Sequence, residues 1–415
     1  MSAGAETSDV GRQTAPQAQW RAAIHDLAAF DRPSASEGER RAAEWIAQRL
    51  SQLGCQVDVE EEQAHGRYWW PIVVANLLSA ASGAGVLRRR HFGSRLLGLT
   101  VSGAAAAALW DDLGHGRRWF RRRFFTKRST WNVVARVGDP DAPRTVALVA
   151  HHDAAHSGLV FHPALGRIGP RLLPRLHERS KQAVPILYGV WLGPVITALG
   201  ALAGSRRVVL AGVTVSLGAT GVMLDIARSP VVPGANDNLS AVGVLLAVAE
   251  ALRNDPIPGV RTLLLSTGSE ESFSEGMQAF GRRHFPELDP ERTEFLCLEC
   301  LGGPTLIVLE AEGMLKMRHY TPGMRESLAQ AAAQAGVNIA RGLRTVAATD
   351  AIIALRAGYP AVTLASVAET KLPLNYHWPS DRPEALHWET IEQAIAVCTR
   401  FLRDRANGVR LSNPG

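Results

Sequence analysis

Acidic and histidine side chains recur where an apolar run of this chain gives way to turn residues. In the stretch VRTLLLSTGSEE, residues 260–271, an apolar run breaks at Ser-Thr-Gly-Ser and then presents Glu270 and Glu271 side by side. Adjacent carboxylates next to a buried strand are electrostatically unfavourable unless a cation lies close to them. The pair therefore indicates a cation-binding site.

Four further segments place the same residue types at the same kind of boundary. They contribute His151 and Asp153 (ALVAHHDAAHSG), Asp237 (VVPGANDNLSAVG), Glu299 (FLCLECLGG) and His377 (NYHWPSDRPE). Two imidazoles with several carboxylates form a ligand set that suits zinc, manganese or cobalt. Two such metals need one bridging carboxylate and terminal ligands on each side. The histidine and acidic residues of the five segments suffice for these ligands. One carboxylate is then left over, and it could serve as a base.

The elements that must position these side chains alternate between strands and helices. We expect strands at 132–137, 144–150, 260–266, 293–298, 305–309 and 360–365, and helices at 238–252, 275–284, 323–335, 350–357 and 386–404. This alternation predicts an α/β three-layer sandwich with a mostly parallel, mixed central sheet. Ligands in such sheets gather at the carboxyl ends of strands, so the five segments are predicted to meet there.

The N-terminal part reads as a tail followed by helices. Residues 1–18 contain no apolar segment of the kind that a secretory signal requires, and we expect a disordered tail. Residues 19–53 are predicted to be helical, with Ser34 or Ser36 as a cap and Gly54 as a stop. A single catalytic domain would then occupy 19–415.

Two apolar insertions interrupt that domain, at about 69–110 and 183–227. Each is a pair of uncharged apolar stretches joined by a short basic turn. Their lengths approach the roughly 20 residues that a helix needs to cross a bilayer. We expect two membrane hairpins, and therefore a lipid bilayer as a partner. The alternative is a pair of soluble helical hairpins that pack on each other or on a partner chain.

The charge of the chain is consistent with a membrane surface. The formal net charge is +6, and residues 117–128, RRWFRRRFFTKR, alternate cations with aromatic residues. Beside an apolar hairpin this run is predicted to contact lipid head groups rather than nucleic acid. The density of cations on the domain side favours a cytoplasmic catalytic part. The four cysteines, Cys55, Cys297, Cys300 and Cys398, are too scattered for a disulfide framework and are expected to be buried thiols.

The motifs together resemble those of the zinc aminopeptidases of peptidase family M28, which have a zinc-exopeptidase fold. The resemblance is carried by HHD (151–153), GANDN (234–238), SEE (269–271), LEC (298–300) and YHWPSD (376–381), in the family's order. It covers 132 to the C-terminus, apart from the second insertion, and the helices at 19–53 also resemble the family's opening segment. One departure is Glu299, since the family commonly has Asp at that position.

The resemblance implies a role for each of these residues. One zinc would be held by His151 and Glu299, the other by Glu271 and His377, and Asp237 would bridge the two. Asp153 would orient the imidazole of His151, and Glu270 would be the general base. Mn²⁺ or Co²⁺ are possible substitutes for Zn²⁺.

Neighbouring polar residues are predicted to have other functions. His152 and His156 are expected to be supporting or surface histidines, and Asp381 a turn or cap residue. Asp350 is expected to cap the helix that follows it.

These observations predict a membrane-attached, zinc-dependent exopeptidase that hydrolyses N-terminal peptide bonds, with peptides as substrates. Two alternatives stay open. One is glutaminyl cyclisation or hydrolysis of another amide on the same scaffold. The other is a non-catalytic membrane receptor or scaffold that kept the fold.

Overall fold

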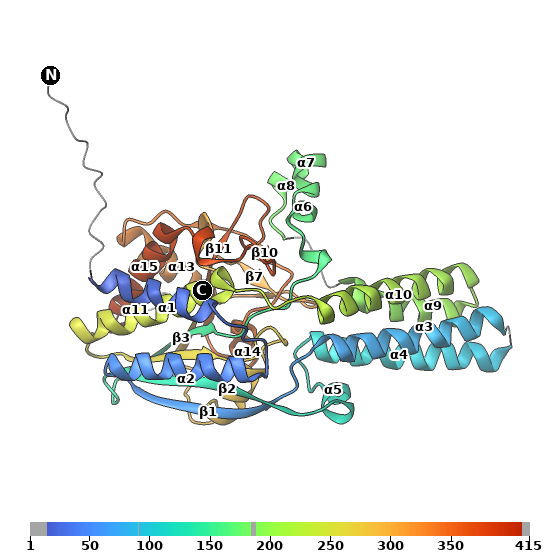
Figure 1. Cartoon of the computed structure of the whole chain (residues 1–415), viewed down its shortest axis with the longest axis horizontal. Helices are drawn as coiled ribbons and strands as arrows, with labels where there is room; N and C mark the ends of the chain where they lie inside the picture. Colours follow the sequence, from blue (N-terminus) through green and yellow to red (C-terminus); the bar gives the residue numbers. More distant parts are fainter. Residues whose placement is uncertain (1–14, 90, 184–187, 409–415) are drawn as a thin grey trace, which may run out of the picture.

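The computed structural model describes residues 15–89, 91–183 and 188–408 of the chain. These residues form a three-layer α/β domain, from one side of which a bundle of long helices extends (Figure 1). The predicted fold class, an α/β sandwich with inserted apolar helices, is confirmed.

An eight-stranded sheet forms the middle layer of the domain. Its strands, from one edge to the other, are β1 (Gln56–Ala64), β2 (Arg128–Gly138), β4 (Arg261–Thr267), β3 (Thr145–His151), β5 (Thr293–Glu299), β11 (Ala361–Val367), β6 (Thr305–Val308) and β9 (Ala340–Arg341). The central strands β4, β3, β5 and β11 are parallel, while β2 and β6 run antiparallel to their inner neighbours. The central strands are buried on both faces, which explains why they read as continuous apolar runs.

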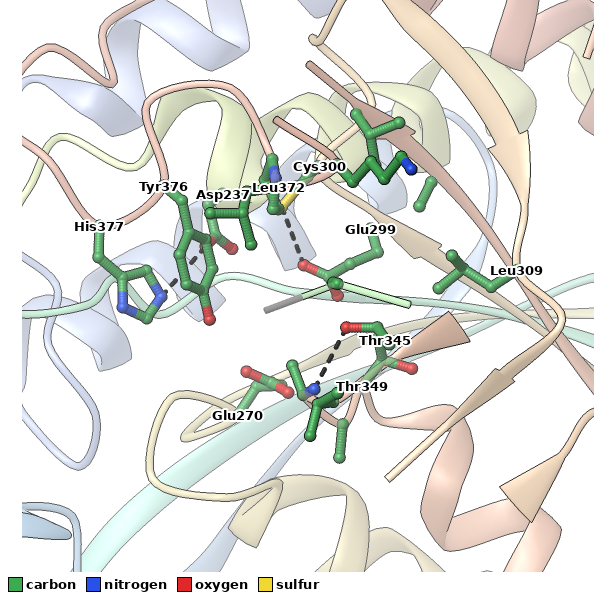
Figure 2. Close-up of a pocket in the computed structure, with 18 of the residues that line it drawn as sticks. Asp237, Glu270, Glu299, Cys300, Leu309, Thr345, Thr349, Leu372, Tyr376 and His377 are labelled. Carbon is green, nitrogen blue, oxygen red and sulfur yellow. Dashed lines mark hydrogen bonds and ion pairs between the residues drawn. The ribbon is translucent and has the colours of Figure 1, made fainter. Parts of the chain in front are cut away.

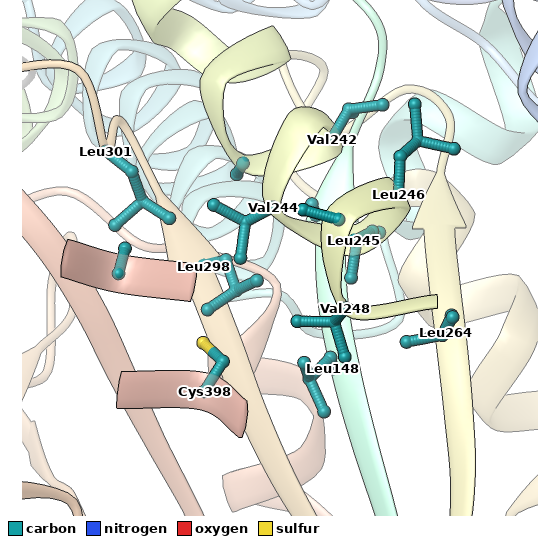
Figure 3. Close-up of a cluster of buried hydrophobic side chains, with 14 of the residues drawn as sticks. Leu148, Val242, Val244, Leu245, Leu246, Val248, Leu264, Leu298, Leu301 and Cys398 are labelled. Atoms are coloured by element: carbon teal, nitrogen blue, oxygen red, sulfur yellow. The ribbon is translucent and has the colours of Figure 1, made fainter. Parts of the chain in front are cut away.

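Helices cover both faces of this sheet. One face carries α1 (Ala15–Ala28), α2 (Glu37–Gln52), α11 (Ser240–Asn254), α13 (Pro322–Gln334) and α15 (Trp388–Ala406). The other carries α12 (Glu275–His284) and α14 (Ala351–Arg356). Each face of the sheet has its own hydrophobic core. Along β3, Leu148 packs into the core beneath α11 and α15, seen in Figure 3, whereas its neighbours Ala147 and Val149 pack into the core beneath α12 and α14. This alternation is the two-residue period of a strand.

Short elements complete the domain. They are α5 (Trp119–Phe124), η1 (Leu159–Phe161), α6 (Pro163–Gly166), α7 (Ile168–Leu172), α8 (Pro174–Arg179), η2 (Ala235–Leu239), η3 (Pro383–Ala385) and a small sheet of β10 (Arg344–Thr345), β7 (Ala311–Glu312) and β8 (Arg318–His319).

The two apolar insertions form one four-helix bundle. Helices α3 (Trp69–Arg88) and α9 (Tyr188–Ala203) lead away from the domain, and α4 (Phe92–Leu113) and α10 (Arg206–Arg228) return to it (Figure 1). The buried side of each helix is made largely of small residues: Ser79, Ser82, Gly83, Gly98, Ser102, Gly193, Thr197, Gly200, Gly212 and Ser216. Helices α9 and α10 approach so closely that a Cβ added to Gly212 would lie 2.4 Å from the backbone nitrogen of Thr197.

The outward side of the bundle carries the large apolar residues. Exposed leucines occur on all four helices: Leu77, Leu78, Leu96, Leu97, Leu192, Leu199, Leu202, Leu210 and Leu217. By length and composition α3, α4 and α10 could cross a membrane, whereas α9 is shorter. The segment Ala235–Asn254 meets the same criteria, but it is almost wholly buried in the domain core.

Some sequence-based boundaries were wrong. Residues 1–14 of the expected disordered tail 1–18 lie outside the described residues, and residues 15–18 form the start of α1 instead of tail. The edge strand β1 was not predicted, because its exposed sequence QVDVEEEQA is rich in acidic residues. The expected cap Ser36 is confirmed: its side chain accepts a hydrogen bond from the Glu39 N–H.

Candidate metal centre

The sequence-predicted site residues meet at the carboxyl edge of the parallel strands. His151 is the last residue of β3 and Glu299 the last of β5, and the loop after β4 carries Glu270 and Glu271. Figure 2 shows Asp237, Glu270, Glu299 and His377 directed toward a common space. Parallel strands place their carboxyl ends on one edge of a sheet, which is why such distant residues converge.

The side chains form two groups that share one carboxylate. In the first, Nε2 of His151 lies 3.2 Å from Oδ1 of Asp237 and 3.6 Å from Oε1 of Glu299. In the second, Nε2 of His377 lies 3.3 Å from Oδ2 of Asp237 and 3.1 Å from Oε2 of Glu271. Within each group the candidate ligand atoms all lie within 4.8 Å of one another. Asp237 thus presents one oxygen to each group.

The unsatisfied atoms of this cluster fit divalent cations. Among the described residues, Nε2 of His151, Oε1 of Glu271 and Oε2 of Glu299 are buried without a hydrogen-bond partner. Buried polar atoms are rarely left unpaired, so three such atoms on residues of one cluster indicate a ligand. The donor set of imidazole nitrogens and carboxylate oxygens is one that zinc accepts.

The electrostatics of the site also favour added positive charge. Burial raises the pKa of the Glu270, Glu271 and Glu299 carboxyls, because a low dielectric disfavours their charged forms. Burial acts in the opposite direction on His377, but the charge of Glu271 and hydrogen bonds to Asp237 and Glu271 raise its pKa to about 10. A cluster with more carboxylates than imidazoles thus draws in positive charge.

Asp153 connects the two halves of the site. Its carboxylate accepts hydrogen bonds from the Ser34 hydroxyl at 2.6 Å and from the backbone N–H groups of Glu270 and Glu271 at 3.0 and 3.2 Å. It also lies 3.4 Å from Nδ1 of His151. With Nδ1 facing Asp153, Nε2 of His151 is left to face the cluster. The predicted contact between Asp153 and His151 is therefore present. Asp153 also fixes the backbone of Glu270 and Glu271.

Glu270 occupies a different position from the other acids. Its Oε2 lies 3.8 Å from Nε2 of His151, and the residue is part of neither candidate ligand group. The side chain is 12% exposed and faces the adjoining cleft. A carboxyl in this place can exchange a proton with a group in the cleft.

The turn that carries Asp237 is fixed from several sides. Asp381 accepts hydrogen bonds from the backbone N–H groups of Asn236 and Asp237, at 2.7 and 3.1 Å. The Asn238 side chain donates to the Leu298 carbonyl and accepts from the Cys300 N–H. Asp381 is thus a turn-holding residue, as predicted, and the turn it holds is that of the shared carboxylate.

Two buried residues behind the site were missed by sequence reasoning. The Arg32 guanidinium donates to the backbone carbonyls of His152, Pro233 and Gly234, and so joins the first two motifs. Glu39 accepts from the hydroxyls of Thr130 and Ser269 and so holds the segment before the glutamate pair. Both lie in the region 19–53, where the polar residues look like the surface of an amphipathic helix.

A buried ionic cluster links the bundle to the glutamate loop, which is the loop after β4 that carries Glu270 and Glu271. Arg121 donates to Asp112 of α4 at 3.0 Å and to the Ser272 carbonyl at 3.0 Å. Arg121 also lies 3.5 Å from Glu275, and Arg118 lies 3.8 Å from Glu275. The prediction that all of 117–128 contacts lipid head groups is therefore wrong for Arg118 and Arg121, which are buried. Arg117, Arg122 and Arg123 remain exposed.

The other polar residues near the motifs have separate environments. His152 is buried against Ser266, and burial lowers its pKa to about 3. His156 contacts the Ser229 carbonyl and the ring of Trp69. Asp350 stands at the start of α14, but its side chain makes no capping bond and instead accepts from the Thr267 hydroxyl, so the predicted cap was wrong.

The predicted free thiols are confirmed, since all four cysteines are buried and unpaired in the described residues. Cys300 lies beside the site, where its thiol donates to Oε1 of Glu299 at 3.2 Å (Figure 2). Burial raises the pKa of the Cys300 thiol, so it stays protonated and supports the carboxylate rather than competing for a metal.

A cleft opens beside the cluster and is lined mainly by apolar side chains. Asp237, Glu270, Glu271, Glu299 and His377 form its acidic end. Its walls include Phe161, Leu309, Met314, Leu343, Leu372 and Tyr376. The acidic end can bind a cationic amine, and the walls suit an apolar side chain.

The sequence resemblance is confirmed for part of the chain: residues 219–402 match the profile of Peptidase family M28. This range includes Asp237, Glu270, Glu271, Glu299 and His377, whereas His151 lies before it. No protein of curated function matches the chain in sequence.

Solved structures with a similar fold include a Zn-dependent exopeptidase from Parabacteroides distasonis, at a TM-score of 0.54 and 14% identity over 94% of this chain and 98% of that one. A glutaminyl cyclase from Tannerella forsythia has a TM-score of 0.55 and 14% identity over 94% and 98%. An aminopeptidase from Aneurinibacillus sp. strain AM-1 has a TM-score of 0.53 and 13% identity over 94% and 93%. The likeness to these structures is one of fold, and the family match is confined to residues 219–402.

Proposed function

Because residues 219–402 match peptidase family M28 and the fold is shared with zinc-dependent exopeptidases, we propose that this chain is a membrane-attached zinc aminopeptidase. The observation that carries the proposal is the pair of ligand groups with Asp237 in common. A bridging carboxylate between two imidazole–carboxylate pairs is the arrangement that a two-metal hydrolytic site needs.

In this proposal each group holds one zinc ion. His151 and Glu299 are the terminal ligands on one side, and His377 and Glu271 on the other. When bound, the zinc pair supplies Lewis acidity that polarises the scissile carbonyl and makes water a better nucleophile. The longer Glu299, in place of the family's usual Asp, still brings an oxygen to 3.6 Å from Nε2 of His151.

The proton transfers fall to Glu270. It accepts a proton from the attacking water and delivers that proton to the departing amine. Burial raises the pKa of its carboxyl toward neutral pH. A residue that both takes up and gives up a proton works best when its pKa lies near the working pH. Asp153 fixes the backbone of Glu270 through the 3.0 Å hydrogen bond and so sets the carboxyl's position.

The cleft supports an exopeptidase rather than an endopeptidase. Its acidic end lies at the metal cluster, so a free α-amino group can be neutralised next to the bond that breaks. The apolar walls then receive the first side chain. An uncharged leucine-type residue at the N-terminus is the substrate we expect.

Glu270→Gln tests the assignment of the base. The variant keeps the shape of the side chain, so zinc content should stay unchanged while hydrolysis of a leucyl peptide falls about 10²- to 10⁴-fold. Glu326→Gln, an exposed position on α13, is the matched control and should retain full activity. Turnover that persists in Glu270→Gln contradicts the role of Glu270, and a loss of zinc in that variant would make Glu270 a ligand.

A second candidate is glutaminyl cyclisation, which the structural likeness to glutaminyl cyclases favours. It needs the same polarised carbonyl, but the substrate's own α-amine is the attacking group. Peptides that begin with Leu and with Gln separate the two reactions. Release of free leucine supports the aminopeptidase, whereas loss of ammonia from the Gln peptide without a new amino terminus supports the cyclase.

We also propose that the bundle spans a lipid bilayer and that the catalytic domain lies on the cytoplasmic side. Support for the first part comes from the exposed leucines of the bundle and from helices of about 20 residues. Support for the second comes from the exposed cations Arg117, Arg122 and Arg123, which follow α4 at its domain end. Extraction of the membrane fraction with alkaline carbonate tests the first part, since a spanning protein stays in the pellet. Protease accessibility in sealed vesicles of known orientation tests the second.

A further inference from the structure

The segment 159–181 projects from the domain: it begins beside the site, where Phe161 lines the cleft, and its later residues are mostly exposed. It follows the first metal motif and precedes α9, and it contains η1 and the short helices α6, α7 and α8. Figure 1 shows it leaving the body near the point where the bundle joins the domain, in a direction roughly crosswise to the bundle axis. We call this segment the basic arm.

The basic arm exposes an unusual amount of apolar side chain. Its exposed residues are Leu159, Leu165, Ile168, Leu172, Leu173 and Leu176. Leu172 is 73% exposed and Leu176 is 64% exposed. Large apolar groups clustered on one short segment are costly in water, and such clusters mark contacts with a protein or a membrane.

Cations accompany these apolar residues at regular spacing. Arg167, Arg171, Arg175, Arg179 and Lys181 are all exposed, and Glu178 is the sole acid in 159–181. The arginines recur every four residues, and Arg167, Arg171 and Arg175 are each followed by an exposed apolar residue. Leucines with interleaved arginines are the composition of segments that lie in the head-group region of anionic membranes.

The position of the arm identifies its partner. If the bundle is the membrane-crossing part, a segment that runs crosswise from its base lies along the membrane surface. The helix α5 joins the same base through α4, and it exposes Trp119, Phe124, Arg122 and Arg123. Two cationic and apolar elements thus adjoin the bundle where the head groups would be.

We propose that the basic arm binds the surface of an anionic lipid bilayer, with its leucines in the interface and its arginines on lipid phosphates. The inference rests on the proposed membrane-spanning bundle, and it is independent of the reaction at the metal centre. The proposal adds a requirement for anionic lipid, which apolar membrane helices alone do not have.

The arm also contacts the loop that carries a candidate ligand. Nζ of Lys371 donates to the Ser180 carbonyl at 2.6 Å, and Nε2 of His177 contacts the Glu369 carbonyl at 2.9 Å. At the other end of the arm, the ring of Phe161 lies 4.6 Å from that of His377. Lipid that orders the arm would therefore also steady the loop 368–377.

A single-cysteine label on the full-length protein tests the docking. The four native cysteines are buried, so Leu172→Cys can be labelled selectively with an environment-sensitive NBD fluorophore. The protein is placed in nanodiscs of phosphatidylcholine with or without phosphatidylglycerol, and quenching by doxyl-labelled lipid is measured. Asn254→Cys, exposed at the end of α11, is the matched control, because α11 lies in the α/β domain on the side away from the bundle (Figure 1).

We expect a blue-shifted emission and strong quenching at position 172, with at least about twofold more quenching when phosphatidylglycerol is present. Position 254 should show neither effect. The triple variant Arg171→Gln, Arg175→Gln, Arg179→Gln, carrying the same label, should lose the dependence on phosphatidylglycerol.

Three outcomes overturn the proposal. Quenching at 172 no stronger than at 254 removes the contact with lipid. Equal quenching with and without phosphatidylglycerol removes the preference for anionic lipid. A blue shift in detergent that grows with protein concentration identifies a second copy of the chain as the occupant. Failure to enter nanodiscs at all overturns the membrane-spanning bundle, and none of these readouts depends on turnover or zinc.

Discussion

The α/β domain and the four-helix bundle differ in the size of the residues that they bury. The domain core is filled by large side chains such as Phe280, Phe295 and Phe401, and its surface is charged. In the bundle, Ser79 and Ser102 share a hydrogen bond at the centre, and leucines such as Leu78 and Leu217 face outward. In the domain the large apolar side chains lie inside, whereas in the bundle many of them lie on the outer surface.

This contrast is expected if the two regions face two different solvents. Water drives large apolar groups inward, as in the domain. Lipid gives no such drive, so helices associate through small residues that allow close backbone contact, with polar groups paired inside. The predictions below test whether each region follows its own rule.

The largest effect is expected from filling a close contact inside the bundle. In Gly212→Val, the new side chain meets the backbone of Thr197 on α9, since even a Cβ would lie 2.4 Å from its nitrogen. We expect destabilisation of about 3 kcal/mol or more, measured as loss of folded protein in detergent. Gly103→Val on α4 enters open space and should change little. If both variants behave alike, the packing of α9 on α10 is not as described.

A charge on the outer face of the bundle should cost somewhat less, but only in a bilayer. Leu78→Lys, near the middle of α3, would place an ammonium in hydrocarbon at a cost of about 2.5–3.5 kcal/mol. The inserted fraction of the protein, assayed by carbonate extraction, should fall. Gln334→Lys on the surface of the domain should have no measurable effect. Normal insertion and improved solubility of Leu78→Lys would instead favour a soluble bundle.

A smaller effect is expected at the junction of the two regions. Burial opposes ionisation of Glu275, but hydrogen bonding to His65 and the charges of Arg121 and Arg118 hold its pKa far below the usual value of 4.5. A lowered pKa means that the folded state favours the carboxylate, so this stabilisation is present above about pH 4.5 and is lost as the pH falls.

Between about pH 4.5 and 3.5 the loss should be about 1 kcal/mol, and below that it should approach 1.4 kcal/mol per pH unit, because the unfolded state then takes up nearly one full proton. The slope of unfolding free energy against pH checks this, and it should be shallower in Glu275→Gln. An unchanged slope would show that Glu275 does not couple the bundle to the glutamate loop.

The residues that form the candidate ligand groups could be singled out from the sequence because strand-end chemistry is local. Each of His151, Glu299 and the glutamate pair follows an apolar run, and the parallel topology then brings them together. The hairpins were similarly visible as uncharged stretches. Spacing alone can predict such features, since a strand or a membrane helix leaves a continuous signal.

The supporting residues were not predictable in this way. Arg32 and Glu39 look like ordinary polar positions around α2, and only the tertiary fold shows that they bind backbone groups of distant motifs. Arg121 was placed on the lipid side because neighbouring cations in sequence look alike. Which of them turns inward depends on Asp112, supplied by another helix.

The order of the elements along the chain has a consequence for biosynthesis. Helices α9 and α10 are inserted between His151 and Asp237, so a ribosome makes the first imidazole, then both helices, and only afterwards the shared carboxylate and the remaining acids. The candidate metal ligands therefore cannot all come together before the second hairpin has been synthesised. If the proposed activity and the membrane-spanning bundle are correct, the site is completed only after the bundle has been synthesised.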